Sequence, residues 1–413
     1  MHISKCLASF VLIFFIVELP SYCNAEIDQK VAEAYMKADY RTAVKLLEDE
    51  AKQLKEKGLK SETINFSDVY QKNLLLANMY AWKLNDFEKA LIKYQNASDV
   101  RQSSKEISQF PPLEVLFIAA IYEQKKDFLR AREYYHNFLK ESVIFNEKEN
   151  DDISIMMSEE LIKFSKYQID GINLKEQTSA QFKPLLPKIK LSSSLPIFQF
   201  LAIVLVPTAQ YDFTIAMKTD LVDFIKQSPI NLNSMILNSA LVLTAAASSV
   251  TESSERAFEA YLLKYPDSYY SLSLRYMFYK FYKESEQHEK AGKLLKEIET
   301  VGRKRGIELI VGSDKRFSSP EKTWETYKDA LIAGDMDTVM ECYAPGRRKH
   351  KKIFEVFGKE KLKEIGGEIG KLEKVSAGKN EAEYMIIRKE NDKEFAYEIH
   401  FYNLDGEWKM QEF

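Results

Sequence analysis

Histidine and cysteine are the residue types most able to hold metals or to act as bases and nucleophiles near neutral pH. Beyond residue 25 the chain carries four histidines and one cysteine, namely His136, His288, His350, His400 and Cys342. None of these histidines has a second histidine or a cysteine at metal-ligand spacing. We therefore expect neither a metal site nor another cofactor in this protein.

The motifs of common enzyme classes are missing from the sequence. It has no Gly-Lys-Ser phosphate loop, no Gly-x-Gly-x-x-Gly fingerprint and no Gly-x-Ser-x-Gly nucleophile elbow. His400, Glu398 and Tyr402 could form a general-base cluster, but their alternating positions on a strand favour a solvated polar face or a dimer contact. Cys342 has no neighbouring base in the sequence, so we expect a buried packing residue. The sequence thus predicts a protein that is not an enzyme.

One dense basic run, Arg-Arg-Lys-His-Lys-Lys, occupies residues 347–352. Such a run could meet lipid phosphates or another acidic polymer, but it has no interleaved aromatic residues on which bases could stack. The whole chain has a formal charge of -3 and a pI near 6.1, so it has no overall positive field. We expect the run to be a solvated loop, and we expect no binding of nucleic acid.

Residues 26–171 are predicted to form amphipathic helix pairs, which would position the binding residues. Small and aromatic side chains recur where the two helices of a pair should meet, most clearly at Ala119, Tyr122, Phe128, Ala131 and Tyr135. Similar turns precede Ala43 and Ala90, which lie 47 residues apart, and Ala131 follows 41 residues later. A small residue at these positions lets the second helix approach the first closely.

A second block of helix pairs is predicted at residues 236–315. There Ala257 is answered by Ala291, 34 residues later, and the residues four positions beyond each alanine also correspond. Residues 172–235 separate the two blocks and contain the helix-interrupting prolines Pro184, Pro187, Pro196, Pro207 and Pro229. We expect an irregular, partly helical connector in this stretch.

The turns and spacings of these helix pairs resemble the tetratricopeptide (TPR) repeat, although two of the spacings exceed the standard 34 residues. An ordinary helical bundle is the alternative interpretation. The resemblance implies a stack whose concave surface, made by the first helix of each pair, suits extended peptides or single helices. In that register the residues predicted to line the groove are Asn78, Trp82, Glu123 and Gln124.

The last part of the chain, residues 316–413, has a different pattern. Ser319 is placed to cap a helix begun by Pro320, Gly334 to end it, and Asp335 to cap a second helix. A third helix is expected from about residue 351 to residue 365, followed by strands. In residues 395–401 the odd positions are apolar, and an Asp-Gly pair at residues 405–406 predicts the final hairpin.

Three helices followed by a curved antiparallel sheet, with Ser-Pro-Glu at the start and Asp-Gly-Glu-Trp-Lys-Met at the end, resemble the nuclear transport factor 2-like cone domain. The resemblance implies a pocket between helices and sheet that serves catalysis in some members and binding or dimerisation in many. The predicted pocket lining is Trp324, Tyr327, Tyr343, Phe354, Tyr384 and Tyr397. Because these side chains are aromatic, such a pocket offers shape but little proton chemistry.

The N-terminal residues 1–25 have the features of a secretory signal peptide. Lys5 gives a positive start, residues 6–17 form an apolar run, and a small polar segment ends at Ala25. The run is too short to span a bilayer, so we expect cleavage after Ala25 and no transmembrane span in the mature chain. Because only Cys342 remains after cleavage, we favour the bacterial periplasm or cell envelope over secretion from a eukaryotic cell.

Together these patterns predict a mainly α protein, in which a TPR-like α-solenoid precedes a small α+β cone domain. We expect an exported adaptor or scaffold that binds a protein or peptide partner through the repeat groove and could form a homodimer through the C-terminal domain. The alternative is a small-molecule-binding or enzymatic protein centred on the cone pocket.

Overall fold

The computed structural model of the chain describes most residues beyond the N-terminal segment. The described ranges are 29–60, 66–104, 111–148, 152–176, 183–191, 206, 208–311, 314–344, 349–390, 393–404 and 406–411. Within them the chain forms sixteen α-helices and a four-stranded antiparallel sheet that is not closed into a barrel. The predicted fold class, mainly α with a small α+β domain, is confirmed.

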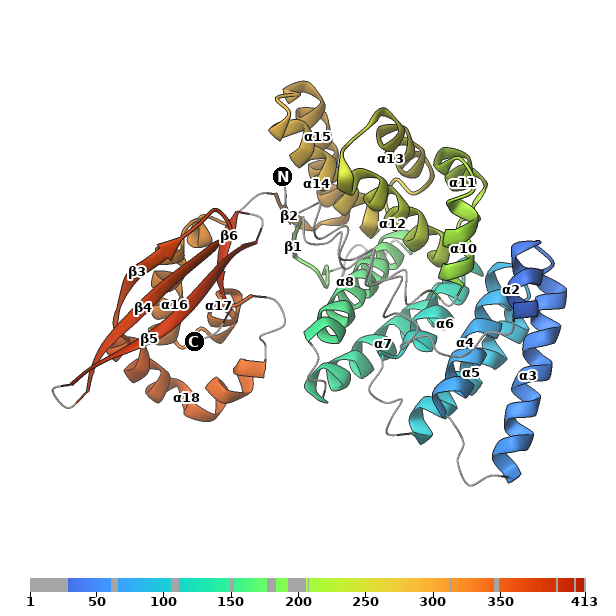
Figure 1. The fold of residues 1–413 in the computed structure, drawn as a ribbon, viewed down its shortest axis with the longest axis horizontal. Helices are drawn as coiled ribbons and strands as arrows, with labels where there is room; N and C mark the ends of the chain where they lie inside the picture. The colour runs from blue at the N-terminus through green and yellow to red at the C-terminus, as the bar shows by residue number, and fades with distance from the viewer. Residues whose placement is uncertain are drawn as a thin grey trace. The chain divides into compact units, whose positions relative to one another are not determined.

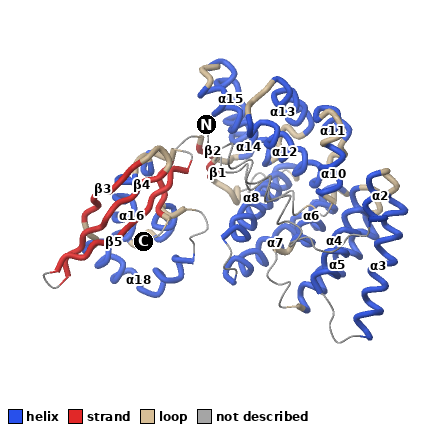
Figure 2. Tube along the Cα trace, viewed as in Figure 1, coloured by secondary structure: helices blue, strands red, loops and turns tan. Residues whose placement is uncertain are grey.

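The described residues fall into two compact units. The larger takes its residues from 1–148, 157–189 and 195–309, and the smaller from 149–156, 190–194 and 310–413. In Figure 2 the helices dominate the first unit, whereas nearly all of the strand structure belongs to the second.

The helices before residue 310 are shown in Figure 1 in colours from blue to ochre. They are α2 (Gln29–Met36), α3 (Tyr40–Lys60), α4 (Phe66–Trp82), α5 (Phe87–Ser103), α6 (Leu113–Gln124), α7 (Phe128–Lys148), α8 (Asp152–Lys175), α10 (Ala209–Ala216), α11 (Leu221–Gln227), α12 (Leu232–Ser248), α13 (Glu252–Lys264), α14 (Tyr269–Glu284) and α15 (His288–Arg305). Two short strands, β1 (Lys188–Lys190) and β2 (Glu308–Ile310), form a separate two-stranded sheet.

Four helix pairs share one kind of turn. Between α2 and α3, α4 and α5, α6 and α7, and α14 and α15, one residue other than glycine adopts the left-handed conformation, with φ between 56° and 60°. These residues are Ala38, Asn85, Lys126 and Glu286. Left-handed backbone is unfavourable for residues with a side chain, so its recurrence marks the same turn built four times.

The second helix of each pair starts in the same way. In three pairs an aspartate, namely Asp39, Asp86 or Asp127, follows the left-handed residue and accepts a hydrogen bond from a backbone N–H three residues later. The fourth residue of the second helix is an alanine in all four pairs, and these alanines are Ala43, Ala90, Ala131 and Ala291, each at most 5% exposed. The alanine pattern therefore marks close helix contacts, as the sequence predicted.

The smaller unit is built from three helices and the larger sheet. Its elements are the 3-10 turn η3 (Lys315–Phe317), α16 (Pro320–Ala333), α17 (Met336–Glu341), α18 (Lys349–Glu368), β3 (Lys371–Ala377), β4 (Glu381–Glu390), β5 (Lys393–Leu404) and β6 (Glu407–Met410). The strands lie in the order β3-β4-β5-β6, with every neighbouring pair antiparallel.

Local signals in the sequence set the ends of these helices. Ser319 caps α16, Gly334 ends it with a φ of 67°, and Asp335 caps α17 by accepting from Thr338 N–H. The third helix is longer than predicted and is kinked at Gly358, where φ is 71° and ψ is 164°. The core of this unit lies between the helices and the sheet.

Candidate functional site

Asn78 and Trp82, the first two predicted groove residues, lie inside the α4–α5 pair. Asn78 is fully buried, and its Oδ1 accepts a hydrogen bond from the hydroxyl of Tyr94 on α5. Trp82 is 9% exposed, and its ring lies edge-on to Phe87, with 6.0 Å between the centroids. Both side chains therefore pack between the two helices of one pair.

Glu123 and Gln124 lie at the end of α6 and differ from each other. Glu123 is half-buried and joins three helices, because its Oε2 accepts from Tyr135 on α7 at 2.9 Å and from Gln168 on α8 at 3.0 Å. Lys175 also approaches it, with 3.4 Å between Nζ and Oε1. Gln124 is exposed. Partner binding through the four predicted residues stays a prediction, but only Gln124 is open to solvent.

The first helices of two pairs are buried on every side. In α4 each residue from Leu74 to Trp82 is buried, and in α6 each residue from Leu113 to Ile121 is buried. Nine consecutive residues complete more than two turns, so no face of these stretches is open to a partner in this conformation. The open concave surface implied by the repeat resemblance is therefore not present along these two stretches.

A carboxylate from a distant segment lies at one end of the helix pairs. Asp212 on α10 accepts two hydrogen bonds at Oδ1, from the Tyr35 hydroxyl at 2.9 Å and from Lys83 Nζ at 2.7 Å. Its second oxygen accepts from Thr208 at 3.0 Å. Tyr35 is the penultimate residue of α2 and Lys83 follows α4, so two successive pairs supply the donors.

The surroundings of Asp212 strengthen this contact. Tyr35 is fully buried, Asp212 is 6% exposed, and the side chain of Lys83 is 17% exposed. Lys83 Nζ also lies 5.4 Å and 5.5 Å from the ring centroids of Tyr35 and Tyr40. Burial, together with the negative charge of Asp212, raises the pKa of Tyr35 well above its ordinary value, which keeps the hydroxyl a donor.

No local pattern in the sequence predicted the site formed by Tyr35, Lys83 and Asp212. Figure 1 shows α10 beside α2, although Tyr35 and Asp212 are separated by 177 residues in the sequence. An aspartate in a proline-interrupted connector carries no local signal of its partner, so only the tertiary fold reveals the contact. Chemically, the arrangement can hold a carboxylate by one hydroxyl and one ammonium group, and the two aromatic rings lie against that ammonium group.

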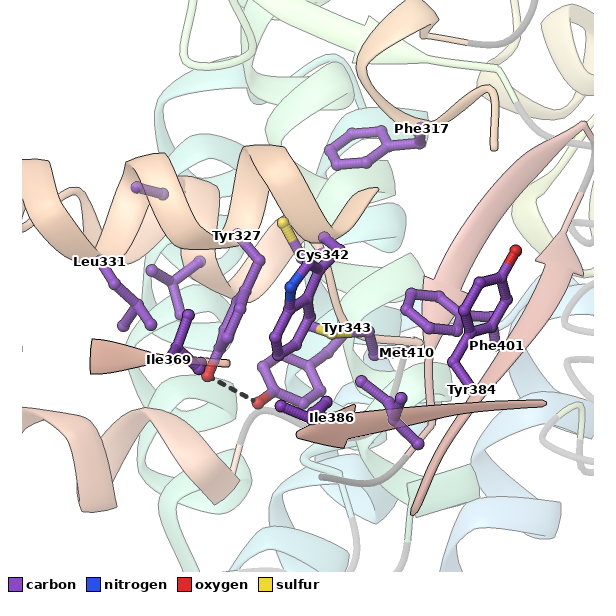
Figure 3. Packing of buried hydrophobic residues seen from close by; sticks show 14 of the residues in the cluster. Phe317, Tyr327, Leu331, Cys342, Tyr343, Ile369, Tyr384, Ile386, Phe401 and Met410 are labelled. Carbon is purple, nitrogen blue, oxygen red and sulfur yellow. Dashed lines mark hydrogen bonds between the residues drawn. The ribbon is translucent and has the colours of Figure 1, made fainter. Parts of the chain in front are cut away.

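The predicted cone lining comes together as a packed core, except for one residue. Trp324, Tyr327, Tyr343 and Tyr384 are each at most 6% exposed, and Phe354 packs against them from α18. Figure 3 shows the hydroxyl of Tyr343 donating to that of Tyr327, at 3.2 Å. Burial raises the pKa of Tyr343 to about 12. These tyrosines therefore pack and hydrogen-bond within the core, and Tyr384 also donates to the carboxylate of Glu321.

Tyr397 is the exception, because it is not part of this packed core. It shares a strand face with Ile399 and Phe401, which are fully buried, but Tyr397 itself is 45% exposed. The alternation of apolar and polar residues predicted the correct face of the strand for Tyr397. It did not reveal how far along β5 the helices cover that face.

The smaller unit also contains a buried group of charges that no local pattern in the sequence predicted. The carboxylate of Glu407 accepts from Lys190, from Asp314 N–H at 2.6 Å and from Lys409, whose Nζ lies 3.2 Å away. Burial, with the nearby charge of Lys190, lowers the pKa of Lys409 to about 8. Strand alternation predicts the face of a residue but gives no sign that two charged residues will be buried.

Cys342 and His400 have the surroundings expected from the sequence. Cys342 is buried, and burial raises the pKa of its thiol to about 12, so the thiolate nucleophile is scarce at neutral pH. His400 pairs with Glu398 at 2.8 Å on the open face of the sheet, where both side chains are about half exposed.

Two searches of the described residues give negative results. Across the described ranges no three or more histidine, cysteine or acidic side chains are grouped so that they could hold a metal ion. The same residues contain no helix whose length and apolar character would let it cross a membrane. No protein-family model matches the sequence, and no curated protein is significantly similar to it.

Proposed function

We propose that this protein is an exported adaptor that holds protein partners on its array of helix pairs. In this proposal the array is of the TPR kind, and the C-terminal α+β unit, which is similar to a nuclear transport factor 2-like domain, is an accessory module. Its place of action is the periplasm or cell envelope, because the N-terminal segment has the pattern of a signal peptide.

The contact of Asp212 with Tyr35 and Lys83 is the observation that carries the proposal. A segment far away in the chain is already held against two successive helix pairs through one carboxylate. Repeat arrays bind polypeptide segments through contacts of this kind, spread over neighbouring repeats. An acidic residue on a partner segment would meet the same hydroxyl, ammonium group and rings.

Exchange of one carboxylate for another makes such binding energetically feasible. Leaving Lys83 without an anion would be costly, because breaking a buried charge pair costs about 3–5 kcal/mol. A partner that supplies its own carboxylate as Asp212 leaves avoids most of this cost. The proposed partner is therefore a protein segment that carries an acidic residue among apolar ones.

The alternative function, a small molecule bound or converted in the C-terminal unit, has weaker support. Five of the six predicted lining residues are members of a packed aromatic core or pack against it. One of them, Tyr384, donates its hydroxyl to the carboxylate of Glu321, and burial together with that carboxylate raises the pKa of the tyrosine, so the hydroxyl keeps its proton at neutral pH. The array therefore remains the better candidate for the main binding surface.

Two measurements on matched variants test the proposal. Capture from an envelope fraction should lose specific partners with the Lys83→Met protein and keep them with Lys83→Arg and with Lys45→Met, which alters an exposed lysine on α3. A labelled peptide of residues 208–217 should bind the Asp212→Ala protein and fail to bind the Asp212→Ala, Lys83→Met double variant. Equal capture and equal peptide binding by all folded variants would rule out this site.

A further inference from the structure

Strand β5 has a partner strand on both edges for only part of its length. It pairs with β4 from Lys393 to Tyr402, whereas β6 pairs with it only from Phe401 to Leu404. One more hydrogen bond, from Gln411 N–H to the His400 carbonyl at 2.9 Å, extends that contact. Figure 1 shows the β4–β5 hairpin running on well beyond the short β6. Among the described residues, no strand covers this edge of β5 from residue 393 to residue 399.

The unpaired edge presents regularly spaced backbone groups. In an antiparallel strand, alternate residues direct both N–H and C=O to the same side. His400 bonds towards β6, whereas Asn403 N–H donates towards the β4 side, to the carbonyl of Asn380 at 2.7 Å. Positions 394, 396 and 398 therefore direct their backbone groups to the open edge. They form a ready template for another strand.

The side chains along this edge differ between the two faces of the sheet. On the core face, Phe395 is 41% exposed and Tyr397 is 45% exposed, in line with the fully buried Ile399 and Phe401. On the other face, the side chain of Glu398 is 52% exposed, and its Oε1 lies 2.8 Å from Nε2 of His400. Glu383 stands directly opposite His400 on β4. The exposed side chains at residues 395–398 are thus aromatic on one face and acidic at Glu398 on the other, while Lys389 of β4 stands opposite residue 394 in the register.

We propose that the open edge of β5, residues 393–399, is a docking site for an extended segment of a protein partner, added as a further strand. The segment that fits has alternating residues, apolar beside Phe395 and Tyr397 and basic beside Glu398. The open edge runs from residue 393 to residue 399, and each residue of a strand advances about 3.4 Å, so a segment of about five to seven residues would cover it. Main-chain hydrogen bonds supply affinity, and the alternating side chains supply specificity. This site is separate from the one formed by Tyr35 and Lys83.

A second copy of the chain fits this edge less well. In a two-fold antiparallel pair with Ala396 on the axis, residues 394 and 398 of the two copies stand opposite each other, and both are acidic. Like charges directly opposite destabilise a strand pair. A shift of the axis to Tyr397 would place His400 opposite residue 394, but the His400 carbonyl is already bonded to Gln411. Charge complementarity therefore favours a basic partner segment over self-association.

The test uses the full chain and a defined probe, a seven-residue peptide that alternates valine and lysine. We expect saturable binding of this peptide. Binding should be at least tenfold weaker when the peptide amides that face β5 are N-methylated. It should also be tenfold weaker when glutamate replaces lysine in the peptide. Ala396→Pro should weaken binding at least tenfold, because proline removes the N–H at the edge, whereas Ala396→Val should not. Lys83→Met should have no effect.

Two further measurements keep the proposal open to refutation if Ala396→Pro fails to fold. Glu398→Lys should weaken binding of the lysine peptide and strengthen binding of the glutamate peptide, each at least fivefold. Equal binding of the methylated and unmethylated peptides, or no response to Glu398→Lys, would overturn the proposal. So would a dimer of the wild-type chain in sedimentation that disappears in a folded Ala396→Pro protein, because the occupant would then be a second copy.

Discussion

The ammonium group of Lys409 lies 3.0 Å from the centroid of the Phe317 ring. It also donates to the carbonyl oxygen of Glu341 at 2.7 Å, and the carboxylate of Glu407 is 3.2 Å away. A lysine in this position has lost nearly all of its water and is held by one charge, one carbonyl group and one aromatic face. The first prediction concerns its ionisation.

Lys409 should titrate near pH 8, because burial and the charge of Lys190 lower its pKa to about 8. An exposed lysine in the unfolded chain has a pKa of about 10.4. Between these values the unfolded chain binds more protons, so the contribution of this group to the free energy of unfolding rises with pH and is lost as pH falls through about 8. The measurement is unfolding of the wild-type and Lys409→Met proteins from pH 7 to pH 10. A pH-independent difference between them would contradict the prediction.

Tyr35→Phe should lower the free energy of unfolding by about 1.5–3 kcal/mol, since the hydroxyl donates to the charged carboxylate of Asp212 inside the protein. Tyr40→Phe is the matched control. The Tyr40 ring faces the same lysine, but among the described residues its hydroxyl makes no hydrogen bond. Chemical denaturation of both variants gives the comparison. Equal losses would mean that the ring, and not the hydroxyl, provides the stability.

Trp82→Ala should lower stability by about 3–5 kcal/mol, because the indole is buried against Phe87 and its loss leaves a cavity. Its effect on partner affinity, measured on the folded variant, should be small. A selective loss of binding with an unchanged melting temperature would restore the original prediction that Trp82 contacts the partner.

Glu286→Gly should raise stability by up to about 1 kcal/mol, because Glu286 has a φ of 60°, which glycine adopts without steric cost. The neighbouring Ser285 has a φ of -90°, so Ser285→Gly should lower stability by a few tenths to about 1 kcal/mol. Thermal unfolding of the two variants distinguishes them. The turn is not strained if both changes lower the melting temperature.

The exported protein should begin at Glu26, because Ala25 ends the small polar segment after the apolar run. Residues 1–28 lie outside the described ranges, so this prediction rests on the amino-acid sequence alone. N-terminal sequencing of protein extracted from the envelope is the measurement. A chain that begins at Met1, or one with lipid on Cys23, would exclude this cleavage site.

Features set by neighbouring residues could be predicted from the sequence. Ser319, Gly334 and Asp335 act within one helical turn of their own positions, and the structure places all three where they were expected. The alanines of the helix pairs were found in the same way, because the turn before each alanine and the contact it makes belong to one local unit.

Features that depend on distant segments could not be predicted. Asn78 carries the polar group expected of a groove residue, but Tyr94 and the helices around it enclose that group. Tyr397 has the strand face expected of a core residue, and only the extent of the covering helices leaves it exposed. The partners of Asp212 and Glu407 are likewise decided by the tertiary fold.

The separation of 177 residues between Tyr35 and Asp212 has a consequence for biosynthesis. A ribosome adds about 5–20 residues per second, so Tyr35 is synthesised on the order of ten to thirty-five seconds before Asp212. During this interval the hydroxyl of Tyr35 and the ammonium group of Lys83 lack their acceptor. The N-terminal pairs therefore reach their final set of contacts only after the segment that carries Asp212 has been made.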